Sequence, residues 1–218
     1  MSTAEQPAAA LSRSREHTRE RLIEAAFEVF AETGVTAATV EQITERAGFT
    51  RGAFYSNFDS KVELLFAIAD AKYAQASAGL QAGVDSILSE SLPAGHPLTP
   101  EVFETIVTRV LALTVVDAKF ALFESEFEAL ALRDSEVAER YAGHTRAVVS
   151  GLAGLLDSAL GRIGVRFKLP AEQATRLLIN AYSATMSAHL LGGGGERPPG
   201  TALADVSALA VLLTERIP

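Results

Sequence analysis

A run of polar side chains between residues 50 and 57 carries the donors needed to contact nucleic acid. Guanidinium, hydroxyl and amide groups hydrogen-bond phosphate oxygens and base edges. Gly52 has no side chain, which permits close approach of another molecule. The apolar Ala53, Phe54 and Phe58 fall on the opposite side of a helix. The pattern therefore predicts a short helix with a buried face and a DNA-contacting face that carries Thr50, Arg51, Gly52, Tyr55, Ser56 and Asn57.

The preceding residues predict the element that positions this helix. Thr39 and Gln42 have the spacing of a capping box, which starts a helix over residues 40–47. Gly48 ends that helix because glycine adopts the left-handed cap conformation, and Thr50 is a favourable N-cap for the next one. Two helices joined in this way are typical of a helix-turn-helix, whose second helix enters the DNA major groove.

Lys61 is a candidate ligand for a DNA phosphate. Ser60 and Glu63 form a second capping box, which predicts a third helix from Lys61 to about Gly83. A cation in the first turn is disfavoured by the helix macrodipole. A helix N-terminus attracts phosphate, however, and a lysine beside it strengthens such a site.

An amphipathic helix over about 18–32, ended by Gly34, is expected to complete a three-helix core. Residues 1–12 are rich in Ala, Ser and Pro and are expected to form a disordered arm. Arg13 and Arg15 follow that arm, and two roles stay open for them: insertion into a minor groove, or simple solvation.

Residues 18–66 resemble the DNA-binding domain of the TetR family of bacterial transcriptional regulators. Thr44 departs from the usual Ala of that family, and Asn57 from a frequent His. The resemblance implies DNA contacts from Thr39, Thr50, Arg51, Gly52, Tyr55, Ser56, Asn57 and Lys61. It covers about a quarter of the chain and rests on Ala25, Ala26, Phe27, Phe30, Gly34, Thr39, Ile43, Ala47, Gly48, Phe49, Thr50, Gly52, Phe54, Tyr55, Phe58, Lys61 and Leu64.

Composition excludes several other classes of protein. The 218 residues include no Cys, so no disulfide framework or thiolate metal site is expected. The four His lack metal-ligand spacing, and no hydrolase, metalloprotease or nucleotide-binding motif occurs. No apolar run reaches the ~18 residues of a membrane span, and the N-terminus lacks a signal-peptide pattern. We therefore expect a cytoplasmic protein that is not an enzyme and has no cofactor or metal.

The charge balance is unusual for a DNA-binding protein. The formal net charge is −8, and residues 1–72 hold 8 basic and 11 acidic side chains, which sum to −3. The field of the remaining residues opposes non-specific binding to DNA, which suits a selective regulator.

Everything after residue 66 is predicted to be helical, which gives an all-α fold with two domains. The helix-turn-helix domain covers 13–60, and a helical effector-binding and dimerisation domain covers 61–218. Loops are expected at 91–99 and at 192–200, because both stretches are rich in Pro and Gly. The expected helices cover about 100–116, 118–131, 135–161, 170–191 and 202–216.

The last two of these helices carry stripes of apolar and small side chains. Two such helices from each subunit can build a four-helix bundle across a two-fold axis. This arrangement resembles the dimer interface of the TetR family, although the same stripes would also suit ordinary core helices. The candidate interface residues are Leu177, Leu178, Ala181, Leu209 and Leu212.

An effector site is implied by the same resemblance, because this half of TetR-family proteins surrounds an apolar cavity for a small molecule. Such sites are mostly apolar with a few polar groups that orient the ligand. Each Phe is also an ordinary core residue, and each polar group can be solvated or internally bonded. The candidate ligand contacts are Phe103, Phe120, Phe127, His144 and Asn180.

Together these features predict a homodimeric, ligand-responsive transcriptional regulator. We expect a repressor that a small apolar or amphipathic effector releases from double-stranded operator DNA. Two alternatives remain open at this point: an all-α small-molecule-binding enzyme or carrier, and an architectural DNA binder without an effector.

Overall fold

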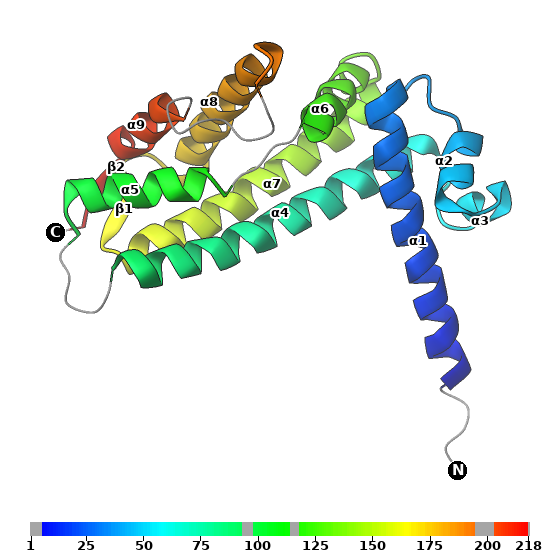
Figure 1. The fold of residues 1–218 in the computed structure, drawn as a ribbon, viewed down its shortest axis with the longest axis horizontal. Coiled ribbons are helices and arrows are strands. Elements are labelled where there is room, and N and C mark those ends of the chain that lie inside the picture. The colour runs from blue at the N-terminus through cyan, green and yellow to red at the C-terminus, as the bar shows by residue number, and fades with distance from the viewer. Residues whose placement is uncertain (1–5, 93–97, 114–117, 195–202, 218) are drawn as a thin grey trace. The chain divides into compact units, whose positions relative to one another are not determined.

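The computed structural model describes residues 6–92, 98–113, 118–194 and 203–217, and within them the chain is almost entirely helical (Figure 1). The predicted all-α fold is confirmed, since 79% of the chain is helical. The helices are α1 (Gln6–Thr33), α2 (Val40–Ala47), α3 (Arg51–Tyr55), α4 (Lys61–Ser91), α5 (Pro100–Leu111), α6 (Ala118–Ala131), α7 (Ser135–Arg162), α8 (Ala171–Leu191) and α9 (Ala204–Leu212). Two short strands, β1 (Val165–Phe167) and β2 (Thr214–Arg216), accompany them.

The chain forms two compact units. The amino-terminal unit comprises residues 1–72 and 122–138, and the carboxy-terminal unit comprises 73–121 and 139–218. Helices α4 and α6 each contribute residues to both units. No helix among the described residues combines the length and the apolar character that crossing a membrane requires.

Aromatic side chains from three helices fill the core of the amino-terminal unit. Phe123 and Phe127 of α6 are both 0% exposed. The ring of Phe123 meets Phe27 of α1 edge-on at 5.8 Å between centroids, and Phe127 meets Phe66 of α4 at 4.9 Å. The carboxy-terminal part of α6 is therefore an integral part of the unit that contains α1, α2 and α3.

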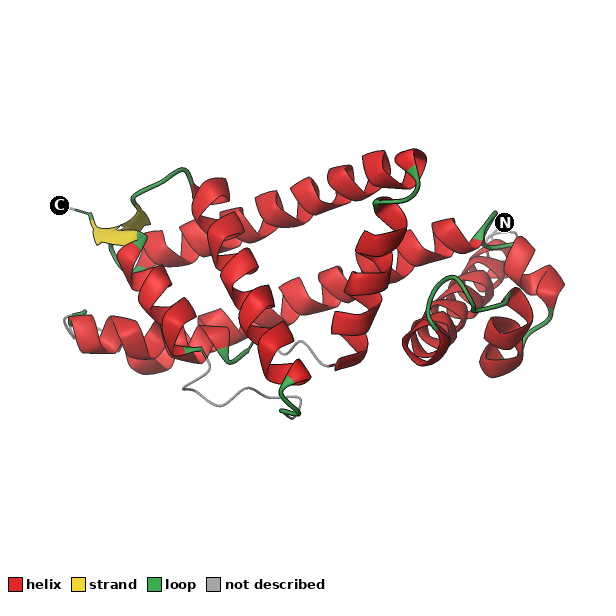
Figure 2. Cartoon of the chain, turned by 90° about the horizontal axis from the view of Figure 1, so that it is seen from above, coloured by secondary structure: helices red, strands yellow, loops and turns green. Residues whose placement is uncertain are grey.

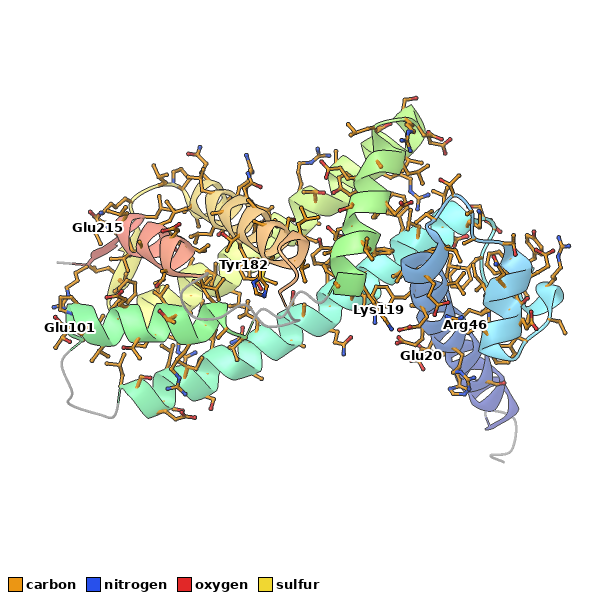
Figure 3. The ribbon with its side chains drawn as sticks, turned by 45° about the horizontal axis from the view of Figure 1, so that its top comes forward. Glu20, Arg46, Glu101, Lys119, Tyr182 and Glu215 are labelled. Atoms are coloured by element: carbon orange, nitrogen blue, oxygen red, sulfur yellow. The ribbon has the colours of Figure 1, made fainter. Side chains whose placement is uncertain are left out.

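Two clusters of buried side chains are found among the described residues of the carboxy-terminal unit. One joins α4 to α5 and consists of Leu80, Val84, Ile87, Leu88 and Ile106. The other lies between α8 and α9 and consists of Tyr182, labelled in Figure 3, with Met186, Leu203 and Val206.

Several predicted boundaries were wrong. Helix α1 begins at Gln6, not near Thr18, so residues 6–12 of the expected disordered arm are helical; residues 1–5 lie outside the described residues. Alanines at 8–10 favour a helix, and Pro7 is tolerated in its first turn. Helix α4 continues through Gly83 to Ser91. Helices α5 and α9 are shorter than predicted, and the expected loops lie largely outside the described residues.

The two strands were not predicted at all. They pair antiparallel, with Val165 opposite Arg216 and Phe167 opposite Thr214 (Figure 2). Arg166 and Glu215 are cross-strand partners that form an ion pair of 2.7 Å. Three residues are too few to show the alternation by which strands are recognised in a sequence.

Candidate DNA-binding site

The local signals that position the helix-turn-helix are confirmed. The Thr39 hydroxyl accepts a hydrogen bond from the Gln42 backbone at 3.2 Å, and the Gln42 side chain accepts one from the Thr39 backbone at 2.8 Å. Gly48 ends α2 with φ 77°, a left-handed conformation that glycine adopts without strain. The Thr50 hydroxyl caps α3 by accepting from the Ala53 backbone at 3.3 Å.

Helix α3 is shorter than predicted because polar side chains compete for its last carbonyl groups. The Ser56 hydroxyl and the Asn57 amide both donate to the Ala53 carbonyl, at 2.9 and 2.8 Å. The regular helix therefore ends at Tyr55, although the Phe58 backbone still donates to the carbonyl of Phe54 at 2.9 Å.

The two faces of α3 are divided as predicted. Phe54 and Phe58 point into the core with 0% and 1% exposure. Tyr55 is 52% exposed, and Asn57 is half-buried. The remaining candidate DNA-contacting residues of this segment are all exposed, namely Thr50, Arg51, Gly52 and Ser56, as is Thr39 before α2.

Arg51 is paired within the protein. Its guanidinium lies 2.6 Å from a carboxylate oxygen of Glu41 and 6.0 Å from the ring centroid of Tyr55. A hydrogen bond with Tyr55, and then the charge of Glu41, raise the pKa of Arg51 above its ordinary value, so this side chain stays cationic. Both partners are more than half exposed, so solvent screens the pair and it contributes little to stability. An anion of higher charge can therefore replace Glu41 as the partner of Arg51 with little loss of stability.

Lys61 makes contacts that the sequence did not predict. Its ammonium donates to the carbonyl oxygens of Ala38, Val35 and Thr36, at 2.6, 3.3 and 3.4 Å. These carbonyls belong to the turn that joins α1 to α2. Lys61 therefore holds the turn immediately before the capping residue of α2, whether or not it also contacts a phosphate.

Lys61→Ala is expected to have two separable effects. Hydrogen bonds to a charged group contribute about 1.5–3 kcal/mol each when well formed, so the half-buried ammonium should account for about 1–2 kcal/mol of stability. If Lys61 also neutralises a phosphate, the slope of log affinity against log salt should fall by about one unit on any DNA sequence. Urea denaturation and fluorescence anisotropy measure these effects independently. An unchanged salt slope in a folded variant would leave Lys61 a purely structural role.

The same turn is held from a second side by α6. A carboxylate oxygen of Glu126 accepts from the Val35 backbone at 3.3 Å. It also lies 3.3 Å from where a side chain on Gly34 would begin, and Gly34 has φ 80°. Glycine is therefore favoured there by conformation, whereas a larger residue would also displace the Glu126 carboxylate slightly. Two side chains therefore fix this turn. Glu126 of α6 accepts from a backbone amide of the turn, and Lys61 of α4 donates to backbone carbonyls of the turn.

Arginines of α1 hold the carboxyl ends of both helix-turn-helix helices. Arg21 donates to the carbonyl of Ala47, the last residue of α2, at 3.1 Å. Arg15 donates to the carbonyl of Ser56, the C-cap of α3, at 2.9 Å. Cations at these positions also complement the helix dipoles. No spacing in the sequence signals such contacts, because they join residues 26 and 41 positions apart.

A further ion pair secures α2 against α1. Arg46, labelled in Figure 3, donates to both carboxylate oxygens of Glu32, at 2.6 and 2.7 Å. Thr44, the departure from the family pattern, is 4% exposed, and its hydroxyl donates to the Glu41 carbonyl at 3.1 Å. The extra hydroxyl is therefore satisfied inside the helix.

The candidate ligand contacts do not all lie in one place. Phe127 is buried in the core of the amino-terminal unit, whereas Phe103, Phe120, His144 and Asn180 belong to the carboxy-terminal unit. Within the latter, Phe120 and His144 flank Tyr73 of α4, with ring centroids 5.6 and 5.2 Å from it. Phe103 is buried on α5, and Asn180 is exposed on α8. Tyr73 was missed, since an isolated aromatic gives no periodic signal.

The candidate dimerisation residues fall into two groups. Leu177 and Leu212 are 45% and 68% exposed. Leu178 and Ala181 instead pack against the subunit's own cluster around Tyr182, and Leu209 is half-buried. Val211 and Leu191 add further exposed apolar surface to α9 and α8, at 37% and 89%.

This architecture defines a class of protein: a helix-turn-helix held by a preceding helix, followed by a helical unit. Residues 22–68 match the family model of the bacterial regulatory proteins, tetR family. The helix-turn-helix segment of the chain is therefore similar to the DNA-binding region of that family.

Three individual proteins illustrate how the similarity is distributed. The transcriptional regulator SrpR of Pseudomonas putida is 53% identical over 53 residues, which are 24% of this chain and 25% of SrpR. The match thus spans about a quarter of that relative. The transcriptional repressor BepR of Brucella suis is 27% identical over 82% of this chain and 83% of its own. The structure of the regulator FadR from Bacillus subtilis, in complex with stearoyl-CoA, shares the fold with a TM-score of 0.60. It is 20% identical and covers 88% of this chain and 97% of FadR.

Proposed function

We propose that the chain is a DNA-binding transcriptional regulator that responds to a small molecule, and most simply a repressor. The observation that carries the proposal is the division of α3 into an inner face of buried Phe and an outer face of exposed donors. This division falls inside the segment that matches the family model. The proposed partner is double-stranded operator DNA, so the proposed location is the cytoplasm. We propose no catalytic activity and no cofactor.

The proposed regulator acts as a homodimer, because a helix-turn-helix of this kind reads two half-sites. The exposed apolar side chains of α8 and α9 supply a self-complementary surface for it. Leu177, Val211 and Leu212 lie on the outside of these helices, and a two-fold axis would bury them against their own copies.

The proposed effector site lies in the carboxy-terminal unit around Tyr73, Phe120 and His144. These side chains come from α4, α6 and α7 and are all half-buried. Their rings supply apolar contact area, while the phenol and imidazole provide polar groups that orient a ligand. This chemistry suits an apolar or amphipathic molecule. Phe127 is not part of this proposed site, because it packs in the other unit.

The proposed signal reaches DNA through the turn between α1 and α2. That turn is fixed by Lys61 of α4 and Glu126 of α6, and both helices contribute residues to both units. A ligand among the aromatic side chains of α4 and α6 would bias these helices. A shift of the turn would then move Thr39 and, with it, α2 and α3.

Reciprocal titration tests this function. An effector that lowers operator affinity by a given factor must itself lose affinity by that factor when operator is bound. A coupling of about 1–3 kcal/mol corresponds to a 5–150-fold change in both directions. Calorimetry with an effector found by screening amphipathic molecules, with and without operator DNA, measures it. Equal effector affinities in the two titrations would contradict ligand responsiveness and favour an architectural DNA binder. Turnover of the ligand without any DNA binding would favour an enzyme.

A further inference from the structure

A surface pocket beside α3 is lined mostly by side chains of α1 that the proposed reading of DNA does not use. The pocket has a volume of about 280 Å³ and is lined by Arg15, Glu16 and Arg19 of α1 and by Asn57. All four residues belong to the amino-terminal unit. Two guanidinium groups and one carboxylate leave the lining with a net formal charge of one positive unit.

The two arginines are held in place, and each keeps N–H groups that no other described residue engages. Arg15 uses one N–H group on the Ser56 carbonyl, at 2.9 Å, and a guanidinium has five. Arg19 lies with its guanidinium carbon 4.8 Å from the ring centroid of Phe58, which is 1% exposed. A contact over a ring face leaves the edge of the guanidinium available to an anion. The pair is therefore arranged to donate to a shared oxyanion.

The side chain of Asn57 has a hydrogen-bond acceptor that receives no hydrogen bond from the described residues. Its amide nitrogen donates to the Ala53 carbonyl at 2.8 Å and to the Ser56 hydroxyl at 3.3 Å. Its amide oxygen is buried and has no hydrogen-bond partner in the part of the chain that the structure describes. A buried acceptor requires a donor. Because this oxygen is shielded from solvent, a water molecule in the pocket does not reach it, and the anion contacts come from the arginines.

The pocket adjoins the end of the helix proposed to enter the major groove. Arg15 bonds the C-cap of α3, and Asn57 is the next residue. A helix of five residues is about 7.5 Å long, whereas the major groove is about 12 Å wide. Because so short a helix does not fill the groove, residues just beyond its end can reach the phosphates that border it.

We propose that this pocket holds one phosphate of the operator backbone between Arg15 and Arg19. This inference rests on the proposed function, because it places the phosphate beside an inserted α3. Such a contact fixes the register of the protein on DNA without reading sequence. It also gives the amino-terminal part of α1 a direct role in binding.

The test is the salt dependence of binding to a duplex selected from a random pool by the wild-type protein. Each neutralised phosphate contributes roughly 0.9 to the slope of log affinity against log salt. Arg15→Gln and Arg19→Gln should each lower the slope by up to about one unit, and the double variant by about one, because the phosphate is shared. Arg15→Lys/Arg19→Lys keeps both charges and should retain the wild-type slope.

Two further variants separate this role from a structural one. Glu16→Gln removes the carboxylate from the lining and should tighten DNA binding by roughly two- to fivefold, a gain that a purely structural role would not give. Arg166→Gln removes an exposed, ion-paired charge from the carboxy-terminal unit and should leave the slope unchanged. Thermal melting followed by circular dichroism establishes that each variant is folded.

The possible outcomes are distinct. An unchanged slope in the folded double variant overturns the phosphate site and leaves the proposed function standing. A wild-type protein that selects no duplex overturns both. A third outcome is that inorganic phosphate alone raises the melting temperature of the wild type but not of the double variant, while both proteins show the same salt slope for DNA binding. The pocket then takes a free anion instead of a DNA phosphate, which also overturns the proposal.

Discussion

Phe123→Ala should destabilise the amino-terminal unit by about 3–5 kcal/mol, the usual range for truncating a buried Phe. Phe123 is 0% exposed and packs against Phe27 at 5.8 Å and Phe127 at 5.9 Å. A substitution in α6 should therefore loosen α1 and α2, which are distant from it in sequence. Chemical denaturation measures the loss, and hydrogen exchange should locate it in the amides of α1 and α2.

The neighbouring Leu122 provides the matched control, since it is 53% exposed. Leu122→Ala should change stability by no more than about 0.5 kcal/mol. A Phe123→Ala variant that loses less than about 1 kcal/mol, or loses protection only outside α1 and α2, would contradict the assignment of residues 122–138 to this unit.

Leu212→Glu should convert the proposed dimer into a folded monomer. Leu212 is 68% exposed in the subunit, so the change costs the fold little, but it places an unpaired charge in an apolar interface. Such a charge costs about 3–5 kcal/mol, which corresponds to a weakening of roughly 10²–10⁴-fold in subunit affinity. Sedimentation should show monomers at micromolar concentration, and operator affinity should fall by at least about a hundredfold because a monomer engages one half-site.

Leu132→Glu is the control for charge, since Leu132 is 82% exposed in the amino-terminal unit. Its sedimentation should match that of the wild type. Leu178, which the sequence equally suggested, is less suitable because it packs on the subunit's own core. A wild-type protein that sediments as a monomer at the same concentration would refute the dimer.

The helix-turn-helix was predictable because its signals are local. Thr39, Gly48 and Thr50 act within three or four residues of themselves, and their geometry follows from residue type. The contacts that fix its position were not predictable, because they join distant parts of the chain. Glu126 meets Val35 across 91 positions, and Arg15 meets Ser56 across 41. No periodic pattern records such a pairing.

The carboxy-terminal half shows the same limit in another form. The sequence does not distinguish a helical Phe that lines a ligand site from one that fills a core. The different locations of Phe120 and Phe127 were therefore not predictable. Packing assigns them to different units. Likewise Leu177 and Leu178 are adjacent in sequence, but only the structure distinguishes the outward side chain from the inward one.

Selection of binding sites from a random pool of duplex DNA tests the central claim most directly. The wild-type protein should enrich an inverted repeat whose half-sites are separated by about 34 Å or a multiple of it. Arg51→Ala should enrich a different or weaker motif, because it removes a side chain from the outer face of α3 without disturbing Phe54 or Phe58. If the wild type enriches no motif and binds the selected pool no better than the starting pool, the chain is not a sequence-specific DNA-binding protein.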